Sequence, residues 1–168
     1  TDAGGNDQFG VDVALGVDTL IVGAHRTDGS GSDAGSAHIF TRSGTNWTEQ
    51  PELTASDAAN GDRFGHRVGI SGNLVVIGSL MNDEGAQDTG AAYVFQGSGS
   101  VWTEELKLTA SDRVANDQFG FGLAIDGNMV LAGAQLNDEL GDNAGAAYVY
   151  EIVPEFSNGT PCTAPAQC

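Results

Sequence analysis

The sequence predicts an all-β protein of beta-propeller-type blades, in which three four-stranded antiparallel repeats of 55 residues follow one another. Three observations support this prediction: a repeat with a constant interval, apolar residues that alternate within each repeat, and glycines at equivalent places in every copy. The constant interval separates three Phe-Gly pairs, which are Phe9-Gly10, Phe64-Gly65 and Phe119-Gly120. A unit of this kind cannot bury its own apolar faces and must stack on copies of itself.

The first strand of each repeat is predicted from alternating bulky and small residues, seen most clearly from Phe9 to Leu15 and from Phe119 to Ile125. A period of two is typical of a strand whose two faces differ. Here one face is bulky, and the other carries mostly glycine and alanine. The bare face would let a neighbouring sheet approach closely.

The second strand is continuously apolar, over residues 20–22, 74–77 and 129–132. Because no polar residue alternates with the apolar ones, we expect both faces of this strand to be covered. Gly72-Asn73 and Gly127-Asn128 precede two of these strands and predict tight hairpins that join them to the first strand.

The third strand is expected at residues 37–40, 92–95 and 147–150, and the fourth at 102–108 and its counterpart in the first repeat. The fourth strand is the most polar, and its counterpart contains Pro51, which a sheet tolerates only at its edge. It is therefore predicted to be the outer edge of each blade.

The domain prediction places the three blades at about 1–55, 56–110 and 111–150, with 151–168 as a C-terminal Pro/Cys segment for assembly or linkage. That last segment lacks the Trp and Leu-Thr-Ala-Ser of the fourth strand, so the third blade is expected to lack its own outer strand.

Closed propellers have roughly four to eight blades, so three blades predict an incomplete propeller or an open blade stack. The outer sides of the first and third blades would then expose apolar surface. The predicted partners are identical chains, joined head to tail in a ring or fibre, or further blades of the same chain.

These motifs resemble the FG-GAP repeat. The resemblance is carried by the Phe-Gly pairs, by Leu-Thr-Ala-Ser-Asp at 53–57 and 108–112, and by strands that open with Gly-Ala-Ala-Tyr-Val at Gly90 and Gly145. It is the blade of the integrin α-subunit head and of many bacterial surface proteins. The resemblance implies a propeller blade, a secreted or cell-surface setting, and a role in binding, adhesion or assembly.

The integrin repeats also carry an Asp-rich calcium loop between the first and second strands. In this sequence the same places hold the short segments 16–19, 71–74 and 126–129, which do not have that pattern. The calcium site of the integrin repeats is therefore not carried over to this chain.

The chain is strongly acidic, with 23 Asp and Glu against 6 Lys and Arg and a formal net charge of -17. Such a surface repels polyanions, so neither nucleic acid nor an anionic membrane is an expected partner. No apolar run approaches the length of about 18 residues that a membrane span needs, so membrane insertion is not expected either.

Aspartates recur in the loops before the first strand and after the second strand of each repeat. In an up-and-down blade these loops emerge at the same end of the sheet, so their carboxylates are expected along one rim. Calcium takes about six to eight oxygen ligands, which makes a calcium rim one interpretation and turn capping the other. The candidate ligands are Asp2, Asp7, Asp28, Asp57, Asp62, Asp83, Asp112, Asp117 and Asp138. Calcium is the one cofactor that the sequence suggests, and no cofactor is expected to be required.

Catalysis is not expected, because His25, His38 and His66 occupy non-equivalent positions of the repeat and form no recurring constellation. Trp47 and Trp102 stand at equivalent strand starts. They predict either packing between blades or stacking on a sugar ring.

Cys162 and Cys168 are the only cysteines and are expected to form a disulfide in an oxidising compartment. Asn46 and Asn158 begin acceptor triplets for N-glycosylation. Both features favour an extracellular protein, either secreted or at the cell surface.

The function expected from the sequence is that of a non-catalytic structural or adhesive module that self-assembles or forms part of a larger propeller. The alternatives are a carbohydrate-binding, lectin-like propeller whose partners are glycans, and an accessory domain of a larger surface protein.

Overall fold

The computed structural model describes residues 4–98 and 100–153. Within these ranges the regular secondary structure is entirely β, with eleven strands and no helix. The strands form three antiparallel sheets in which chain neighbours lie side by side. The prediction of an all-β chain of repeated blades is confirmed.

Sheet 1 consists of β1 (Val13–Leu15), β2 (Thr19–Ala24), β3 (Ser36–Ser43) and β4 (Asn46–Glu49). Sheet 2 consists of β5 (Phe64–Ser71), β6 (Leu74–Ser79), β7 (Ala91–Ser98) and β8 (Val101–Leu108). Sheet 3 consists of β9 (Phe119–Asp126), β10 (Met129–Ala134) and β11 (Ala146–Glu151). The described part of sheet 3 has three strands, and β11 forms its edge there. The residues expected to lack an outer strand, 154–168, lie outside the described ranges.

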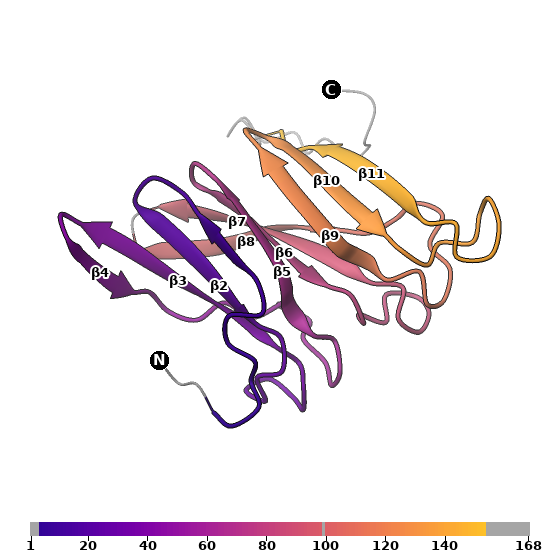
Figure 1. Ribbon diagram of the computed structural model, residues 1–168, viewed down its shortest axis with the longest axis horizontal. Coiled ribbons are helices and arrows are strands. Elements are labelled where there is room, and N and C mark those ends of the chain that lie inside the picture. The colour runs from indigo at the N-terminus through magenta and orange to yellow at the C-terminus, as the bar shows by residue number, and fades with distance from the viewer. Residues whose placement is uncertain (1–3, 99, 154–168) are drawn as a thin grey trace, which may run out of the picture.

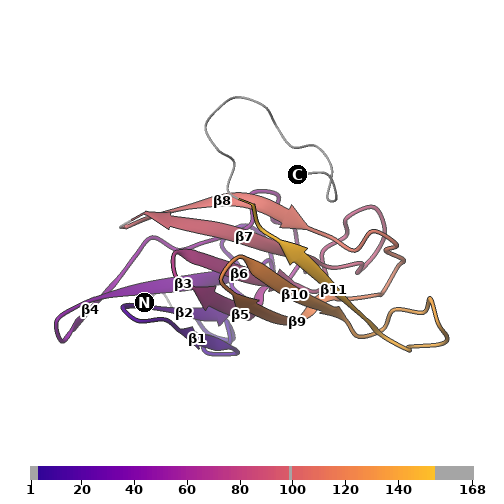
Figure 2. The same cartoon turned by 90° about the horizontal axis from the view of Figure 1, so that it is seen from above.

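The three sheets lie in chain order, with sheet 2 between sheets 1 and 3 (Figures 1 and 2). Figure 1 shows them as an open fan, from β4 at one side to β11 at the other. The blades do not close into a ring, so the described part of the chain is an open blade stack with two end faces.

Two strands are shorter than predicted. β1 begins at Val13 and not at Phe9, whereas β5 includes the equivalent Phe64. Phe64 is held by the preceding sheet, because its backbone N–H donates to the Ala34 carbonyl at 2.9 Å. Within the described residues, no sheet precedes sheet 1 to hold Phe9 in the same way. β4 ends before Pro51, since proline has no N–H for a further ladder bond.

The core is divided into two apolar clusters, one in each gap between sheets. Val75 and Ile77 of β6 belong to the cluster between sheets 1 and 2, and Val76 of the same strand belongs to the cluster between sheets 2 and 3. All three side chains are fully buried. The prediction that the second strand is covered on both faces is therefore confirmed for sheet 2.

Adjacent sheets meet backbone to backbone at the Phe-Gly pairs. A Cβ at Gly23 would clash with the Gly65 carbonyl, and a Cβ at Gly78 would clash with the Gly120 carbonyl, in both cases well inside 3.0 Å. We call this contact the Phe-Gly joint. One half of the joint is the Phe-Gly pair of a sheet. The other half is two glycines of the sheet before it: one near the end of the second strand, such as Gly78, and one just before the third strand, such as Gly90.

Substitution of Gly78 by alanine is expected to lower the free energy of unfolding by about 1–3 kcal/mol, because the new methyl group pushes the Phe-Gly joint apart. Gly133 is the matched control, since it has the same place in sheet 3 and its Cβ would meet nothing closer than 3.9 Å. Urea unfolding of Gly78→Ala and Gly133→Ala tests this expectation, and equal losses in the two variants would contradict it.

Candidate functional site

Both ends of the stack expose apolar side chains that are buried in the middle sheet. Val13, on the outer face of sheet 1, is 64% exposed, whereas its counterpart Val68 in sheet 2 is 6% exposed. Val149, on β11 of sheet 3, is 64% exposed, whereas its counterpart Val94 is fully buried. We call the outer face of sheet 1 the N-terminal face and the outer face of sheet 3 the C-terminal face. Each has the composition of an interior surface without the neighbour that would cover it.

The C-terminal face contains a hollow of about 430 Å³ at the end of β10 and the start of β11. We call it the socket. It is lined by Phe121, Gly122, Gly133, Ala134, Gln135, Gly145, Ala146 and Ala147. In sheet 2 the counterparts of Gly133 and Gly145 are Gly78 and Gly90, and these contact the backbone of Phe119-Gly120. The socket is therefore one half of a Phe-Gly joint.

The N-terminal face carries the other half. The Phe9 side chain is 38% exposed, whereas Phe64 and Phe119 are fully buried. A Cβ at Gly10 would meet nothing within 4 Å. The rings of Phe9 and His38 meet edge to face with centroids 5.2 Å apart, much as those of Phe64 and Tyr93 do at 5.4 Å. The Phe9-Gly10 pair therefore packs on its own sheet as the other pairs do, but within the described residues it is not inserted into a socket.

The acidic loops gather at one end of the sheets. The Arg63 N–H donates to the Asp33 carbonyl at 3.1 Å, which joins the loop before the first strand to the loop after the second strand of the preceding sheet. Gln118 and Asp88 form the same bond in the next pair of sheets. The candidate aspartates of the described residues lie in these loops.

In each loop before a first strand, the aspartate nearer the strand caps the loop. Asp62 accepts hydrogen bonds from the Ala59 N–H at 2.9 Å and the Asn82 amide at 3.2 Å. Asp117 is bound in the same way by the Val114 N–H and by Asn137, and Asp7 accepts from the Gly4 N–H. Asp62 is almost fully buried, and this burial raises its pKa.

The aspartates after the second strands also bind backbone. Asp28, Asp83 and Asp138 each accept from the N–H five residues later, at 2.8, 2.9 and 2.5 Å. Across residues 4–98 and 100–153, no group of three or more His, Cys, Asp or Glu is placed to hold a metal ion. The geometry supports turn capping. Asp2 lies outside the described residues, and a calcium rim stays a prediction.

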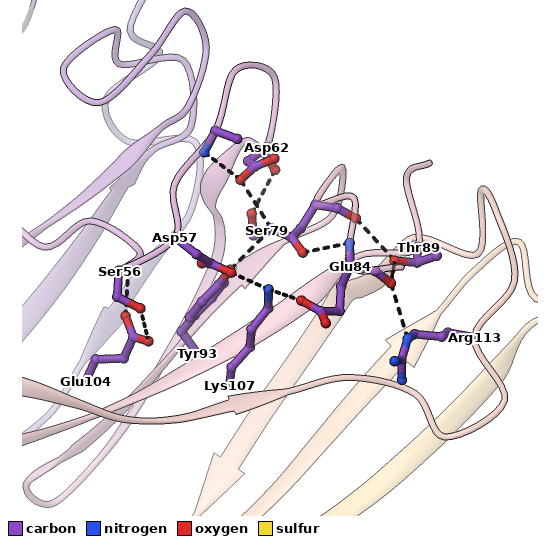
Figure 3. Close-up of polar contacts among 12 residues, drawn as sticks. Ser56, Asp57, Asp62, Ser79, Glu84, Thr89, Tyr93, Glu104, Lys107 and Arg113 are labelled. Atoms are coloured by element: carbon purple, nitrogen blue, oxygen red, sulfur yellow. Dashed lines mark hydrogen bonds and ion pairs between the residues drawn. The ribbon is translucent and has the colours of Figure 1, made fainter. Parts of the chain in front are cut away.

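Sheet 2 holds a polar cluster that sequence reasoning missed (Figure 3). The Lys107 ammonium contacts Asp57 at 2.5 Å and Glu84 at 2.7 Å, and the Tyr93 hydroxyl donates to Asp57 at 2.7 Å. Burial opposes ionisation of Asp57, but the hydrogen bonds from Lys107 and Tyr93 prevail and lower its pKa. We call this arrangement the lysine bridge. Its one sequence signal is the Asp-Tyr separation of 36 residues, which recurs at Asp112 and Tyr148.

Two histidines lie between sheets 1 and 2. The rings of His25 and His66 are 5.4 Å apart, and their buried Nδ1 atoms have no hydrogen-bond partner among the described residues. Burial and the nearby charge of Arg67 lower the pKa of His66 to about 4, and burial followed by Arg63 lowers the pKa of His25. The equivalent residues one repeat later are Leu80 and Phe121. The Phe121 ring also lies 5.5 Å from that of His66.

The two tryptophans differ in their surroundings. Trp102 packs on Gly97 and against the core between sheets 1 and 2, which fits the packing interpretation. Trp47 is partly exposed on β4, with the Arg42 guanidinium 5.6 Å from the centre of its ring. Sugar stacking by either ring stays a prediction.

Asn46 is exposed at the start of β4, and its glycosylation stays a prediction. Asn158, Cys162 and Cys168 lie outside the described residues, and so do their predicted modifications. The strands and loops described here include no helical segment with the length and hydropathy of a membrane span.

Acid is expected to destabilise the chain through the two histidines. An unfolded histidine takes up its proton near pH 6.5, whereas folded His66 does so only near pH 4. The unfolded state therefore binds more protons in this window, and the free energy of unfolding falls as the pH is lowered through it.

The double variant His25→Leu/His66→Phe copies the residues of the next pair of sheets, and its loss of stability between pH 6.5 and pH 4 should be smaller than that of the unmodified chain. Urea midpoints measured across this window test the prediction. Parallel pH profiles for the two proteins would refute it.

The FG-GAP repeat family model matches the chain three times, over residues 1–40, 47–95 and 102–150. The second and third matches begin within β4 and β8 and end within β7 and β11, so each of these repeats crosses from one sheet to the next. No curated protein matches the chain. FG-GAP repeats generally serve structural or adhesive roles and typically occur in extracellular proteins. Since the matches cover well over half of the sequence and each includes a Phe-Gly pair, the chain belongs to the FG-GAP repeat family.

Proposed function

We propose that this chain is a non-catalytic structural or adhesive module of the cell exterior, which joins FG-GAP blades to one another through its two end faces. One observation carries the proposal. The socket of the C-terminal face and the Phe9-Gly10 pair of the N-terminal face are the two halves of the joint that already connects sheets 1, 2 and 3.

The backbone of the socket matches the joints within the chain. Phe64 and Phe119 each donate their N–H to the preceding sheet, to the carbonyls of Ala34 and Thr89, at 2.9 Å in both cases. The counterpart of these acceptors in sheet 3 is the carbonyl of Ala144, beside the socket. A Phe9-Gly10 pair placed in the socket would donate the Phe9 N–H to this carbonyl. It would also form the close backbone contact seen at the other Phe-Gly joints.

Burial of the exposed apolar side chains supplies the driving force. Covering a fully exposed Val, Leu or Phe side chain contributes about 1.5–3 kcal/mol. Val13 and Leu15 on the N-terminal face, and Leu131 and Val149 on the C-terminal face, are each exposed by 46% or more. Contact between the faces would bury several such side chains at once, which favours association over the isolated stack.

The two faces are different surfaces, so their contact is head to tail. Such a contact closes into a ring where the rotation between copies permits it and otherwise extends into a fibre. The Phe-Gly pair that fills the socket belongs to a second copy, or to a further blade where the chain is longer. The same physical contact operates in both arrangements.

Self-association is tested by size-exclusion chromatography with light scattering over a range of micromolar concentrations. The chain has a mass of 17.2 kDa, and the measured mass is expected to exceed this and to rise with concentration. Gly133→Val fills the socket and should abolish the association. The fold should be kept, because the nearest heavy atom to a Cβ at Gly133 is 3.9 Å away.

Gly29→Val is the control for this experiment, since Gly29 lies in an exposed loop and its Cβ would also meet nothing within 4 Å. It should associate like the unmodified chain. A compact monomer at every concentration would overturn the proposal, and so would association that Gly133→Val leaves unchanged.

A further inference from the structure

Within the described residues, sheet 3 differs from sheet 2 in having no outer strand beside its third strand. β7 is paired along its length with β8, and Tyr93 lies opposite Lys107 in this pairing. β11 is the counterpart of β7, and within the described residues it pairs only with β10. A free edge presents backbone donors and acceptors that can pair with another strand.

The outer strand of sheet 2 supplies more than backbone pairing. Its Lys107 forms the lysine bridge and lies 5.5 Å from the centre of the Tyr93 ring. Figure 3 shows Lys107 reaching from β8 between Asp57 and Glu84, which belong to two different loops. The lysine side chain is 20% exposed, so its attraction to the two carboxylates is screened less than that of a surface ion pair. The fourth strand is thus fastened to the loops of its own blade by charge.

Sheet 3 reproduces the acidic side of this arrangement. The Tyr148 hydroxyl donates to Asp112 at 2.6 Å, as Tyr93 donates to Asp57. The Glu139 N–H donates to the Asn137 side chain at 3.2 Å, as that of Glu84 donates to Asn82. The backbone and the tyrosine therefore hold Asp112 and Glu139 in the places that Asp57 and Glu84 have in sheet 2.

The basic side of the bridge has no counterpart in the described part of sheet 3. The neighbouring Asp112 carboxyl raises the pKa of Glu139. The remaining residues, 154–168, contain no lysine or arginine in their sequence. A basic group at this place would therefore have to come from another polypeptide segment.

We propose that the free edge of β11 binds a partner strand in the antiparallel register of β8 on β7, and that this strand places a lysine or arginine opposite Tyr148, between Asp112 and Glu139. The partner is an outer strand of FG-GAP type, added to the sheet by backbone pairing and selected by its charge. The inference rests on the proposed function, because it specifies the chemistry of the neighbour at the C-terminal end.

The first two sheets indicate why the charge matters. Sheet 1 has His38 at the position of Tyr93, and its outer chain segment has Glu52 at the position of Lys107; the two side chains are 3.9 Å apart. A tyrosine on the third strand thus lies beside a lysine of the outer strand in sheet 2, and a histidine lies beside a glutamate in sheet 1. Sheet 3 has Tyr148, which matches the first combination.

The chain itself provides a matched pair of probes. Residues 101–112 form the outer strand of sheet 2 and the turn that follows, and residues 46–57 form the equivalent segment of sheet 1. Both share Trp-Thr-Glu and Leu-Thr-Ala-Ser-Asp, but the second has Pro51 and Glu52 where the first has Leu106 and Lys107. Labelled synthetic peptides of the two segments can be titrated with the full chain by fluorescence anisotropy.

The 101–112 peptide is expected to bind, and the 46–57 peptide is not. Lys107→Gln in the peptide should weaken binding about tenfold, which is the order of a hydrogen bond to a charged group. In the protein, Glu139→Gln should weaken the lysine peptide and reduce the difference between the lysine and glutamine peptides. Glu105→Gln in the protein removes an exposed carboxylate of sheet 2 and is the control. It is expected to leave binding of the 101–112 peptide unchanged.

Several results would overturn the inference: no binding of the 101–112 peptide, equal binding of the lysine and glutamine peptides, or no effect of Glu139→Gln. Calcium binding that Glu139→Gln abolishes, without peptide binding, would assign the two carboxylates to a metal. A dimer that excludes the peptide would assign the edge to a second copy. Both outcomes also overturn it.

The tests of the two proposals are separable. Self-association that depends on Gly133, without peptide binding, would leave the proposed function standing and remove this inference. Peptide binding by a chain that stays monomeric would support this inference and overturn the proposed self-association.

Discussion

The structure depends on the contact between the backbones of adjacent sheets at the Phe-Gly joint. Gly78 and Gly120 lie so close that a single methyl group between them has no room, and the same is true of Gly23 and Gly65. This approach brings the sheets near enough for β6 to be covered on both sides. The two apolar clusters, the order of the sheets and the meeting of the acidic loops all follow from it.

The repeats are alike in sequence, but their surroundings differ, and that difference carries the functional argument. Val68 and Val13 occupy the same place in their sheets, yet one is buried and the other is open to water. Val13 is as apolar as Val68, so its exposure to water is unfavourable. This difference in burial is the basis of the proposal that another blade covers the end faces.

The fold was predictable because three features can be read directly from the sequence: the 55-residue interval, the alternation along the first strands, and proline at an edge. The length of β1 was not, because Phe9 lacks the preceding sheet that holds Phe64. The choice between calcium and turn capping depends on where amides such as that of Ala59 point, which spacing does not reveal. The lysine bridge joins Asp57, Glu84 and Lys107 across large separations and occurs once among the described residues, so no repeat signal marked it.

The family repeat runs across the boundary between sheets, from the outer strand of one to the third strand of the next. Each duplicated unit therefore contributes one Phe-Gly pair and one pair of receiving glycines. A gene that gains or loses a whole unit by recombination changes the number of joints but creates no new kind of contact. Variation in array length is accordingly a change that this architecture tolerates without redesign of its interior.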